Sequence, residues 1–195
     1  MAGQDQGRLL SFEVEGTEEP LMARGGLALV YQVAQALRIP QVVDRGLPPP
    51  GSGRGYRPSA FVMPLLLMFH GGGRRLEDLR EVRGEVSLRQ LLGMEEMPAS
   101  CTVGDWLRRM EEKGLAGLGR VNQHLIMEIL SRDGEASYTL DVDGTILETE
   151  KEGAQWTYKK VKGYQPLLGF LGGEGMVLHE EFRQGNVPPG TGAVG

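Results

Sequence analysis

The chain offers little sulfur chemistry. Cys101 is the one cysteine among 195 residues, so an intramolecular disulfide is excluded. A single thiol also cannot build a thiolate metal site by itself. The stability and the function of this protein must therefore rest on other side chains.

Long apolar segments are also missing. The longest one, Phe61–Phe69, is far too short to span a bilayer. Residues 1–16 lack the basic region and continuous apolar run of a secretory signal. With 40% hydrophobic and 24% charged residues, the composition is that of a globular protein. We expect one or two domains, a cytoplasmic location and no membrane partner.

The net charge of −5 gives no overall attraction to nucleic acid, but the charges are unevenly distributed. Thirteen arginines lie between Arg24 and Arg120, whereas acidic residues gather in the N-terminal tail and after Glu135. Binding to nucleic acid depends on a local basic face rather than on the total charge. Charge alone leaves open whether these arginines form such a face or an ordinary solvated surface.

Residues 26–134 carry a helical pattern, after an N-terminal tail (1–25) with a strand-like segment at 9–16. We expect helices over 26–38, 58–70, 74–83 and 115–130. The residues 46–58, rich in proline and glycine, are predicted to form a loop. Two apolar stripes should face the core: Leu27, Val30, Ala34 and Leu37 in the first helix, and Leu118, Val121, Leu125 and Ile129 in the last.

Residues 86–113 have the outline of a helix-turn-helix. A short helix is followed by a turn with Pro98 and by a second helix that Ser100 or Thr102 would cap. Asp105 lies three residues after Thr102, which is capping-box spacing.

In the helix-turn-helix interpretation, Arg108 and Arg109 on the second helix contact DNA phosphates. A plain helical hairpin with Trp106 and Met110 packed inward explains the same pattern. The sequence leaves both interpretations open.

The sequence period changes from helical to alternating near residue 135. One face of the next strand would carry Leu140, Val142 and Ile146, and the other Asp141, Asp143 and Thr145. Further strands are predicted over 163–172 and 175–186. The expected fold class is α+β, with helices over 26–134 and strands over 135–195.

The motif Asp-Val-Asp-Gly-Thr at 141–145 is compatible with two chemistries. It resembles the nucleophile motif of haloacid-dehalogenase-like phosphatases, in which the first Asp, here Asp141, is phosphorylated. It also resembles the first metal-binding strand of ribonuclease-H-like nucleases and transposases. The phosphatase needs further parallel strands, joined by crossovers of about a dozen residues or more. The residues after Thr145 read as successive strands instead, so the phosphatase is the weaker alternative.

Six segments occur together in a characteristic order and spacing. They are "GGLALVYQVAQAL", "LPPPGSGRGYRPSAFVMPLLLMFHGGGRRLEDLREVR", "LRQLLGMEEMPASCTVGDWLRR", "GLAGLGRVN", "YTLDVDGTILETEKEGAQWTYKKVKGYQPLLGFL" and "VLHEEFRQGNVPP". From Phe12 to Gly190 the chain thereby resembles the DDE transposases of bacterial insertion sequences. The resemblance implies a helical DNA-binding region at 26–134, followed by the first three strands of a ribonuclease-H-like α/β fold.

The resemblance also implies a metal ligand. The first catalytic carboxylate of the family lies in an Asp-small-Thr pattern, which places it at Asp143, and Asp141 is the alternative ligand or a supporting group. In such enzymes two Mg²⁺ ions, about 4 Å apart, activate the attacking oxygen and stabilise the leaving oxygen. Carboxylate oxygens are the ligands that Mg²⁺ prefers.

Two further carboxylates that the family needs, an Asp on a later strand and a Glu on a helix, have no match in this sequence. Glu180 and Glu181 lie where the family places no catalytic group, and we expect a solvated or salt-bridged strand end there. The three strands should leave one sheet face uncovered and one edge unpaired.

We therefore expect an N-terminal transposase fragment that is inactive alone. Its partners would be double-stranded DNA at terminal inverted repeats, and a second copy or the full-length transposase. A DNA-binding repressor of transposition is the alternative function.

Two other segments are candidate DNA contacts. Arg54 and Arg57 lie in the predicted loop 46–58 and can reach a DNA backbone. Lys159, Lys160 and Lys162 are mixed with aromatic residues in 156–164, a combination that can hold nucleic-acid strands by charge and stacking. An ordinary solvated loop and turn explain the same residues.

Overall fold

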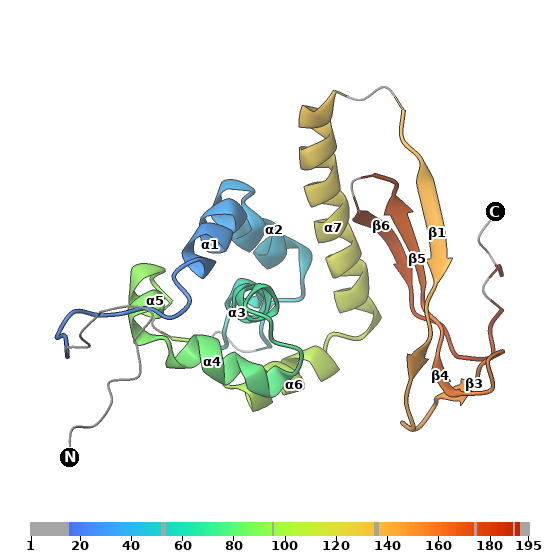
Figure 1. Ribbon diagram of the computed structural model, residues 1–195, viewed down its shortest axis with the longest axis horizontal. Coiled ribbons are helices and arrows are strands. Elements are labelled where there is room, and N and C mark those ends of the chain that lie inside the picture. Colours follow the sequence, from blue (N-terminus) through green and yellow to red (C-terminus); the bar gives the residue numbers. More distant parts are fainter. Residues whose placement is uncertain are drawn as a thin grey trace, which may run out of the picture.

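The helical part of the chain and its strands lie on either side of one long helix. The computed structural model describes residues 16–51, 54–94, 96–134, 137–173, 175–188 and 190–191. Figure 1 shows the long helix α7 (Glu111–Asp133) between the other helices and the strands. The predicted α+β class is confirmed. The strand-like segment at 9–16 lies outside the described residues, except for Gly16.

The described residues before α7 form six short α-helices and one 3-10 helix. They are α1 (Leu27–Ala36), α2 (Ile39–Gly46), α3 (Pro58–His70), η1 (Leu76–Asp78), α4 (Leu79–Gly84), α5 (Val86–Leu91) and α6 (Ser100–Arg108). The residues 47–57, within the predicted loop, connect α2 to α3.

Helix α3 is the centre of this region, and Figure 1 shows it end-on among the other short helices. It packs against α1, α2 and α4. Its sequence is apolar on nearly all sides, which is the pattern of a buried helix. Phe61 and Leu67 are 4% and 0% exposed, and burying such side chains contributes roughly 1.5–3 kcal/mol each. Phe61 also stacks on Trp106 with ring centroids 4.6 Å apart, which confirms that Trp106 faces inward.

The helix predicted over 26–38 ends earlier, and a second helix, which the pattern does not predict, follows it. α1 ends at Ala36 and α2 begins at Ile39, with Arg38 between them at a φ of 56°. Pro40 explains the break, because its ring would clash with the carbonyl of Ala36 in a continuous helix. The apolar stripe of the first helix is confirmed, since Leu27 and Ala34 are buried and the other two members pack beside them.

The caps predicted for α6 are wrong. Ala99 is the N-cap residue and no side chain caps the helix. Ser100 is already the first helical residue, and Thr102 lies inside the first turn. Asp105 forms an ion pair with Arg108 instead, at 2.7 Å.

The candidate helix-turn-helix at 86–113 consists of α5 and α6, joined by residues 92–99. This connection is longer than the turn of three or four residues that is typical of the motif. α5 packs on α4, and α6 packs on η1. The role of this pair in DNA binding stays a prediction.

The described strands form two antiparallel sheets. In one the order is β1 (Leu140–Gly144), β5 (Leu167–Leu171) and β6 (Met176–Glu181). In the other it is β2 (Leu147–Glu148), β4 (Lys162–Tyr164) and β3 (Gln155–Trp156). The strands predicted near 137–147 and 163–172 are thus each divided in two.

The pairing register continues across this division. Gly144 pairs with Leu167 and Leu147 with Tyr164, and between them the N–H of Thr145 donates to the carbonyl of Pro166 at 3.1 Å. Pro166 has no N–H to complete the ladder, so both strands are interrupted here. The two sheets therefore follow one another along a shared pair of strands.

Strand β1 is the outer strand of its sheet and pairs only with β5 among the described residues. Leu140 and Val142 on this strand are 60% and 42% exposed. The uncovered apolar surface and the open edge expected from the sequence are both found on β1.

Helix α7 joins the two parts of the chain. One side of it packs against α2 and another against β6, where the side-chain amide of Asn122 donates to the carbonyl of Val177 at 2.8 Å. Gly117 permits the contact with α2, because a Cβ there would lie 2.4 Å from the carbonyl oxygen of Gly46. The predicted core stripe holds for its first three members, whereas Ile129 is 41% exposed.

Within the described residues, no helix combines the length and the apolar character needed to cross a bilayer.

The α2–α7 contact gives a matched pair of variants. Gly117→Ala should lower the free energy of unfolding by about 1–3 kcal/mol, because the new methyl group overlaps α2. At Gly119, on the same helix, an added Cβ would meet no atom within 4 Å. Gly119→Ala should therefore raise the stability by about 1 kcal/mol through helix propensity. Urea unfolding measures both, and equal effects would show that α2 and α7 are not in contact here.

A second prediction concerns pH. The Asp78 carboxylate accepts hydrogen bonds from the backbone N–H groups of Arg74 and Arg75 at 2.8 and 2.9 Å. These bonds hold the pKa of Asp78 below its ordinary value. A carboxylate with a lowered pKa stabilises the folded state above its ordinary pKa, and this stabilisation is lost as the pH falls through the lowered value.

Asp78→Ala should therefore lower the urea midpoint near neutral pH, and the difference from the unmodified chain should shrink as the pH falls through the lowered pKa of Asp78. Glu77→Ala, at the exposed neighbouring position, should have little effect at either pH. A loss of stability in Asp78→Ala that does not depend on pH would contradict this account.

Candidate carboxylate site and basic surfaces

The two aspartates of β1 lie on the same face of the sheet, because side chains alternate along a strand. Asp143 pairs with Leu168, and Leu168 pairs with Glu180 on β6. Directly paired residues point to the same face. Asp143, Leu168 and Glu180 therefore form a row across the three strands. Two strand spacings separate the backbones of Asp143 and Glu180 by about 10 Å.

Asp141 and Asp143 are both exposed but have different surroundings. The carboxylate of Asp141 lies over Gly172, where an added Cβ would be 3.1 Å from its Oδ2 atom. Asp141 is thus packed against the turn after β5. Asp143 lies one pair further along, in the row with Leu168 and Glu180, which favours it as the residue that faces a ligand.

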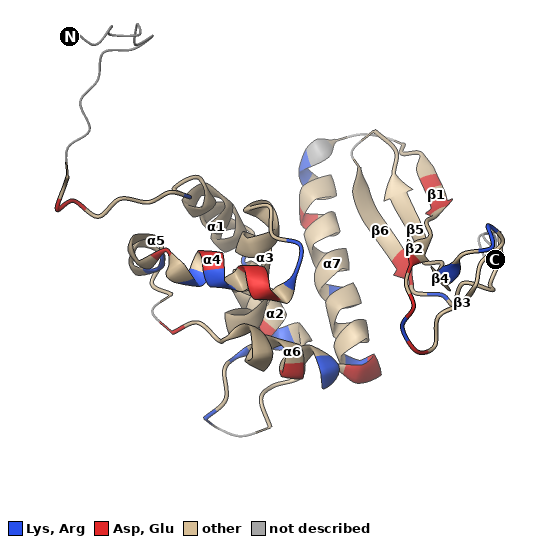
Figure 2. Cartoon of the chain, turned by 60° about the horizontal axis from the view of Figure 1, so that its bottom comes forward, with Lys and Arg blue, Asp and Glu red and all other residues tan. Residues whose placement is uncertain are grey.

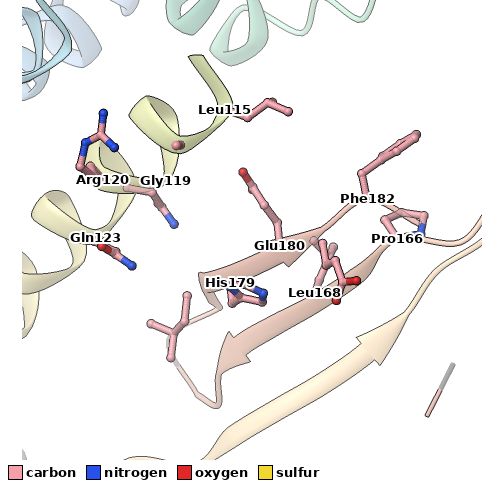
Figure 3. A pocket seen from close by; sticks show the side chains of 13 residues that line it. Leu115, Gly119, Arg120, Gln123, Pro166, Leu168, His179, Glu180 and Phe182 are labelled. Carbon is pink, nitrogen blue, oxygen red and sulfur yellow. The ribbon is translucent and has the colours of Figure 1, made fainter. Parts of the chain in front are cut away.

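A cavity of about 860 Å³ separates α7 from this sheet. Leu115, Gly119 and Gln123 line it from the helix, and Pro166, Leu168, Glu180 and Phe182 from the strands. Figure 3 shows Glu180 extending from β6 toward α7. Because Leu168 and Glu180 share the row of Asp143, the cavity opens on the sheet face that carries the two aspartates. That the cavity and the two aspartates share one sheet face depends on the strand register, so it could not be predicted from the sequence.

The fit of this site to a metal ion is partial. The aspartates offer the oxygen ligands that Mg²⁺ prefers. The described residues contain no group of three or more His, Cys, Asp or Glu side chains that could hold a metal ion. A complete two-metal centre is therefore not formed by these residues.

Glu181 has the structural role expected for it. Its carboxylate forms an ion pair with Arg183 at 2.5 Å, and Arg183 is buried. The hydrogen bond from Arg183 lowers the pKa of Glu181 below its usual value. The salt-bridged strand end is therefore confirmed for Glu181, whereas Glu180 is exposed and lines the cavity.

The phosphatase interpretation finds no support in the sheet. Every strand pairing in the described part of the chain is antiparallel. The parallel neighbours that a phosphatase of this class needs beside its nucleophile strand are not found there. Asp141 therefore lacks the setting in which it would act as a nucleophile.

Two segments that carry predicted DNA-binding arginines border one cavity. This second cavity, of about 420 Å³, is lined by Gly55 and Tyr56 from the loop 47–57 and by Trp106 and Arg109 from α6 and its end. Arg54 and Arg57 flank the two loop residues and are exposed, as are Arg108 and Arg109. The loop and the end of α6 therefore lie next to each other, and both carry exposed arginines.

The four arginines are not equally free to bind an anion. Arg108 pairs with the carboxylate of Asp105 at 2.7 Å. Arg109 donates through Nε to the backbone carbonyl of Asp105 at 3.2 Å, a contact that leaves its charge uncompensated by a carboxylate. Arg109 is therefore the stronger anion-binding candidate of the two.

The three predicted lysines lie together on the β3–β4 hairpin. Lys159 and Lys160 are exposed in its loop, and Lys162 is half-buried on β4 and pairs with Glu150 at 3.7 Å. Figure 2 shows basic segments at this end of the small sheet and acidic segments on β1. Trp156 and Tyr158, the aromatic residues just before these lysines, are 67% and 62% exposed.

Comparison with known proteins assigns the chain to a family. The family model described as Transposase DDE domain group 1 matches residues 4–195. No curated protein and no solved structure matches the chain. The family match spans the helices as well as the strands, and family members act on DNA. The chain is therefore a member of the DDE transposase domain group 1 family.

Proposed function

We propose that this chain binds the terminal inverted repeats of an insertion sequence and provides the first catalytic strand of the transposase. In this proposal residues 26–134 are the DNA-binding region, and residues 135–195 begin a ribonuclease-H-like domain. The observation that carries the proposal is the exposed Asp143 on β1, the first strand of an antiparallel series within a chain that matches the transposase family.

Asp143 is the proposed ligand for Mg²⁺, and Asp141 supports it. The surroundings of the two residues favour this assignment, since Asp141 packs against Gly172 and Asp143 lies in the row that borders the cavity. A bound Mg²⁺ would supply activation of water or of a 3′-hydroxyl for attack at a DNA phosphate. The described residues give the metal one ligand, so we expect this chain alone not to nick element-end DNA.

The exposed arginines of the loop and of the end of α6 are proposed to hold the DNA backbone. Arg54 and Arg57 lie in the loop and Arg109 at the end of α6, the two segments that border the second cavity. None of the three forms an ion pair with a carboxylate among the described residues. Each phosphate neutralised by such a side chain releases counterions, so its contribution appears in the salt dependence of binding.

The test is the affinity of the chain for terminal-repeat duplexes, measured by fluorescence anisotropy over a range of salt concentrations. The chain should bind its own repeats at least about 10-fold more tightly than a shuffled duplex of equal length. Arg109→Ala should weaken both complexes and reduce the slope of log affinity against log salt by about 1.

Arg80→Ala is the control for this experiment, because Arg80 is an exposed arginine on α4 that does not line the second cavity. It should leave the slope unchanged. Equal affinity for the repeats and for shuffled DNA would contradict repeat recognition. An unchanged salt slope in Arg109→Ala would show that the DNA backbone does not contact Arg109.

A further inference from the structure

The β3–β4 hairpin exposes two aromatic side chains beside cations. Trp156 and Tyr158 are 67% and 62% exposed. Trp156 pairs across the hairpin with Lys162, and the ammonium group of Lys159 lies 5.7 Å from the centroid of the Tyr158 ring. Two exposed aromatic side chains and three lysines thus lie within seven residues of the chain.

Hydrogen bonds of its own backbone and of Thr157 order the loop of this hairpin. Thr157 is 5% exposed, and both its N–H and its hydroxyl group donate to the carbonyl of Val161 at 2.9 Å. The N–H of Lys160 donates to the carbonyl of Thr157, also at 2.9 Å. The aromatic residues therefore stand on an ordered turn.

Lys160 occupies a position that glycine normally fills. Its φ is 60°, in the left-handed region. Hairpin loops of three residues use this conformation at their last position, where glycine is favoured because it has no Cβ. A lysine there is strained, and such strain is kept where surrounding structure or function requires it. The ammonium group of Lys160 is a direct candidate for that function.

The chemistry of this surface fits a nucleic-acid strand with unpaired bases. Lys159 and Lys160 make no ion pair with a carboxylate in the described part of the chain and can attract phosphates. In a duplex the faces of the bases are covered by their neighbours. Unpaired bases expose these faces and stack on aromatic side chains.

The hairpin lies close to the proposed metal ligand. Lys160, at the tip, precedes Leu168, the partner of Asp143, by eight residues along the hairpin and β5. Eight extended residues span at most about 28 Å, and this length corresponds to about eight base pairs of DNA at 3.4 Å per step.

We propose that the hairpin tip, formed by Trp156, Tyr158, Lys159 and Lys160, binds unpaired nucleotides within about eight positions of the phosphate at Asp143. The inference rests on the proposed function, since it takes Asp143 as the reference point on the DNA. It adds a substrate feature: the preferred DNA end carries a single-stranded tail or frayed base pairs.

The experiment compares three terminal-repeat duplexes that share one sequence: a blunt form, a form with a single-stranded tail, and a form with an abasic tail of the same charge. The natural tail should be bound at least about 10-fold more tightly than the blunt end, and the abasic tail should lose most of this gain. Equal affinity for the natural and the abasic tails would overturn the stacking proposal.

Fluorescence identifies the residue involved. The chain has two tryptophans, and Trp106→Phe leaves Trp156 as the reporter while keeping an aromatic ring against Phe61. Addition of the tailed DNA should quench the emission of Trp156. Should Trp106→Phe fail to fold, anisotropy of labelled DNA with the unmodified chain gives the same three affinities.

Two variants separate binding from folding. Trp156→Ala should abolish the preference for the natural tail, whereas Phe69→Ala, at an aromatic position on α3 that is 59% exposed, should keep it. Lys160→Gly relieves the left-handed strain, so it should keep or raise the melting temperature while weakening binding of the tail. A preference that survives Trp156→Ala would overturn the proposal, and this result is also expected if the tip contacts a protein.

The outcome is distinguishable from a failure of the proposed function. The preference for repeats is measured by comparing blunt duplexes of repeat and shuffled sequence. The preference for tails is measured by comparing tailed and blunt duplexes of one sequence. A chain that selects its repeats but ignores tails would overturn only the hairpin inference. A chain that prefers tails on any sequence would contradict only the repeat recognition.

Discussion

The close packing of α7 against both neighbours is the constraint on which the rest of the structure depends. On one side Gly117 allows the helix to touch the end of α2, and on another Asn122 is hydrogen-bonded to β6. Helices of this length present two faces, and here each face serves a different part of the chain. The position of the strands relative to the helical region is therefore set by one element.

The packing of α7 also determines where the cavity and the strand β1 lie. Because α7 lies toward β6, the cavity forms beside that strand, and β1 remains at the outer edge of the sheet. Antiparallel register then aligns Asp143 with Leu168 and Glu180. The exposed carboxylate and the cavity belong to one sheet face, while the exposed arginines of the loop and of the end of α6 belong to the helical region. This separation fits a protein that holds DNA with one part and presents its catalytic strand from another.

Much of the fold could be predicted from local patterns in the sequence. The stripe of α1 and the first three members of the α7 stripe follow from apolar periodicity, as does the change to strands near residue 135, and the buried α3 is apolar on nearly all sides. Prediction failed where a single residue overrides the pattern. Pro40 starts α2 in a region that reads as one helix, and Pro166 divides a strand that reads as continuous. The cap predicted at Ser100 or Thr102 failed because the N-cap residue of α6 is Ala99, whose side chain cannot cap a helix.

The candidate site was predictable only in part, for a different reason. Asp143 lies in a motif that the sequence displays directly. Its relation to Glu180 depends on the strand register and could not be read from spacing. The same holds for the cavity between the loop that carries Arg54 and Arg57 and the end of α6, because it requires the packing of a loop against the end of a helix. These residues become neighbours through long-range packing, which a local sequence pattern does not predict.

The central claim is that β1 presents the carboxylate of Asp143 to a divalent cation. Nuclear magnetic resonance of the isotope-labelled chain with added Mn²⁺ tests it most directly, because the paramagnetic ion broadens the signals of nearby amides. The account predicts that the amides of Val142–Gly144 and of Leu168 broaden first. This broadening should be lost in Asp143→Asn and kept in Asp141→Asn. Broadening that persists in Asp143→Asn, or that is lost only in Asp141→Asn, would contradict the assignment.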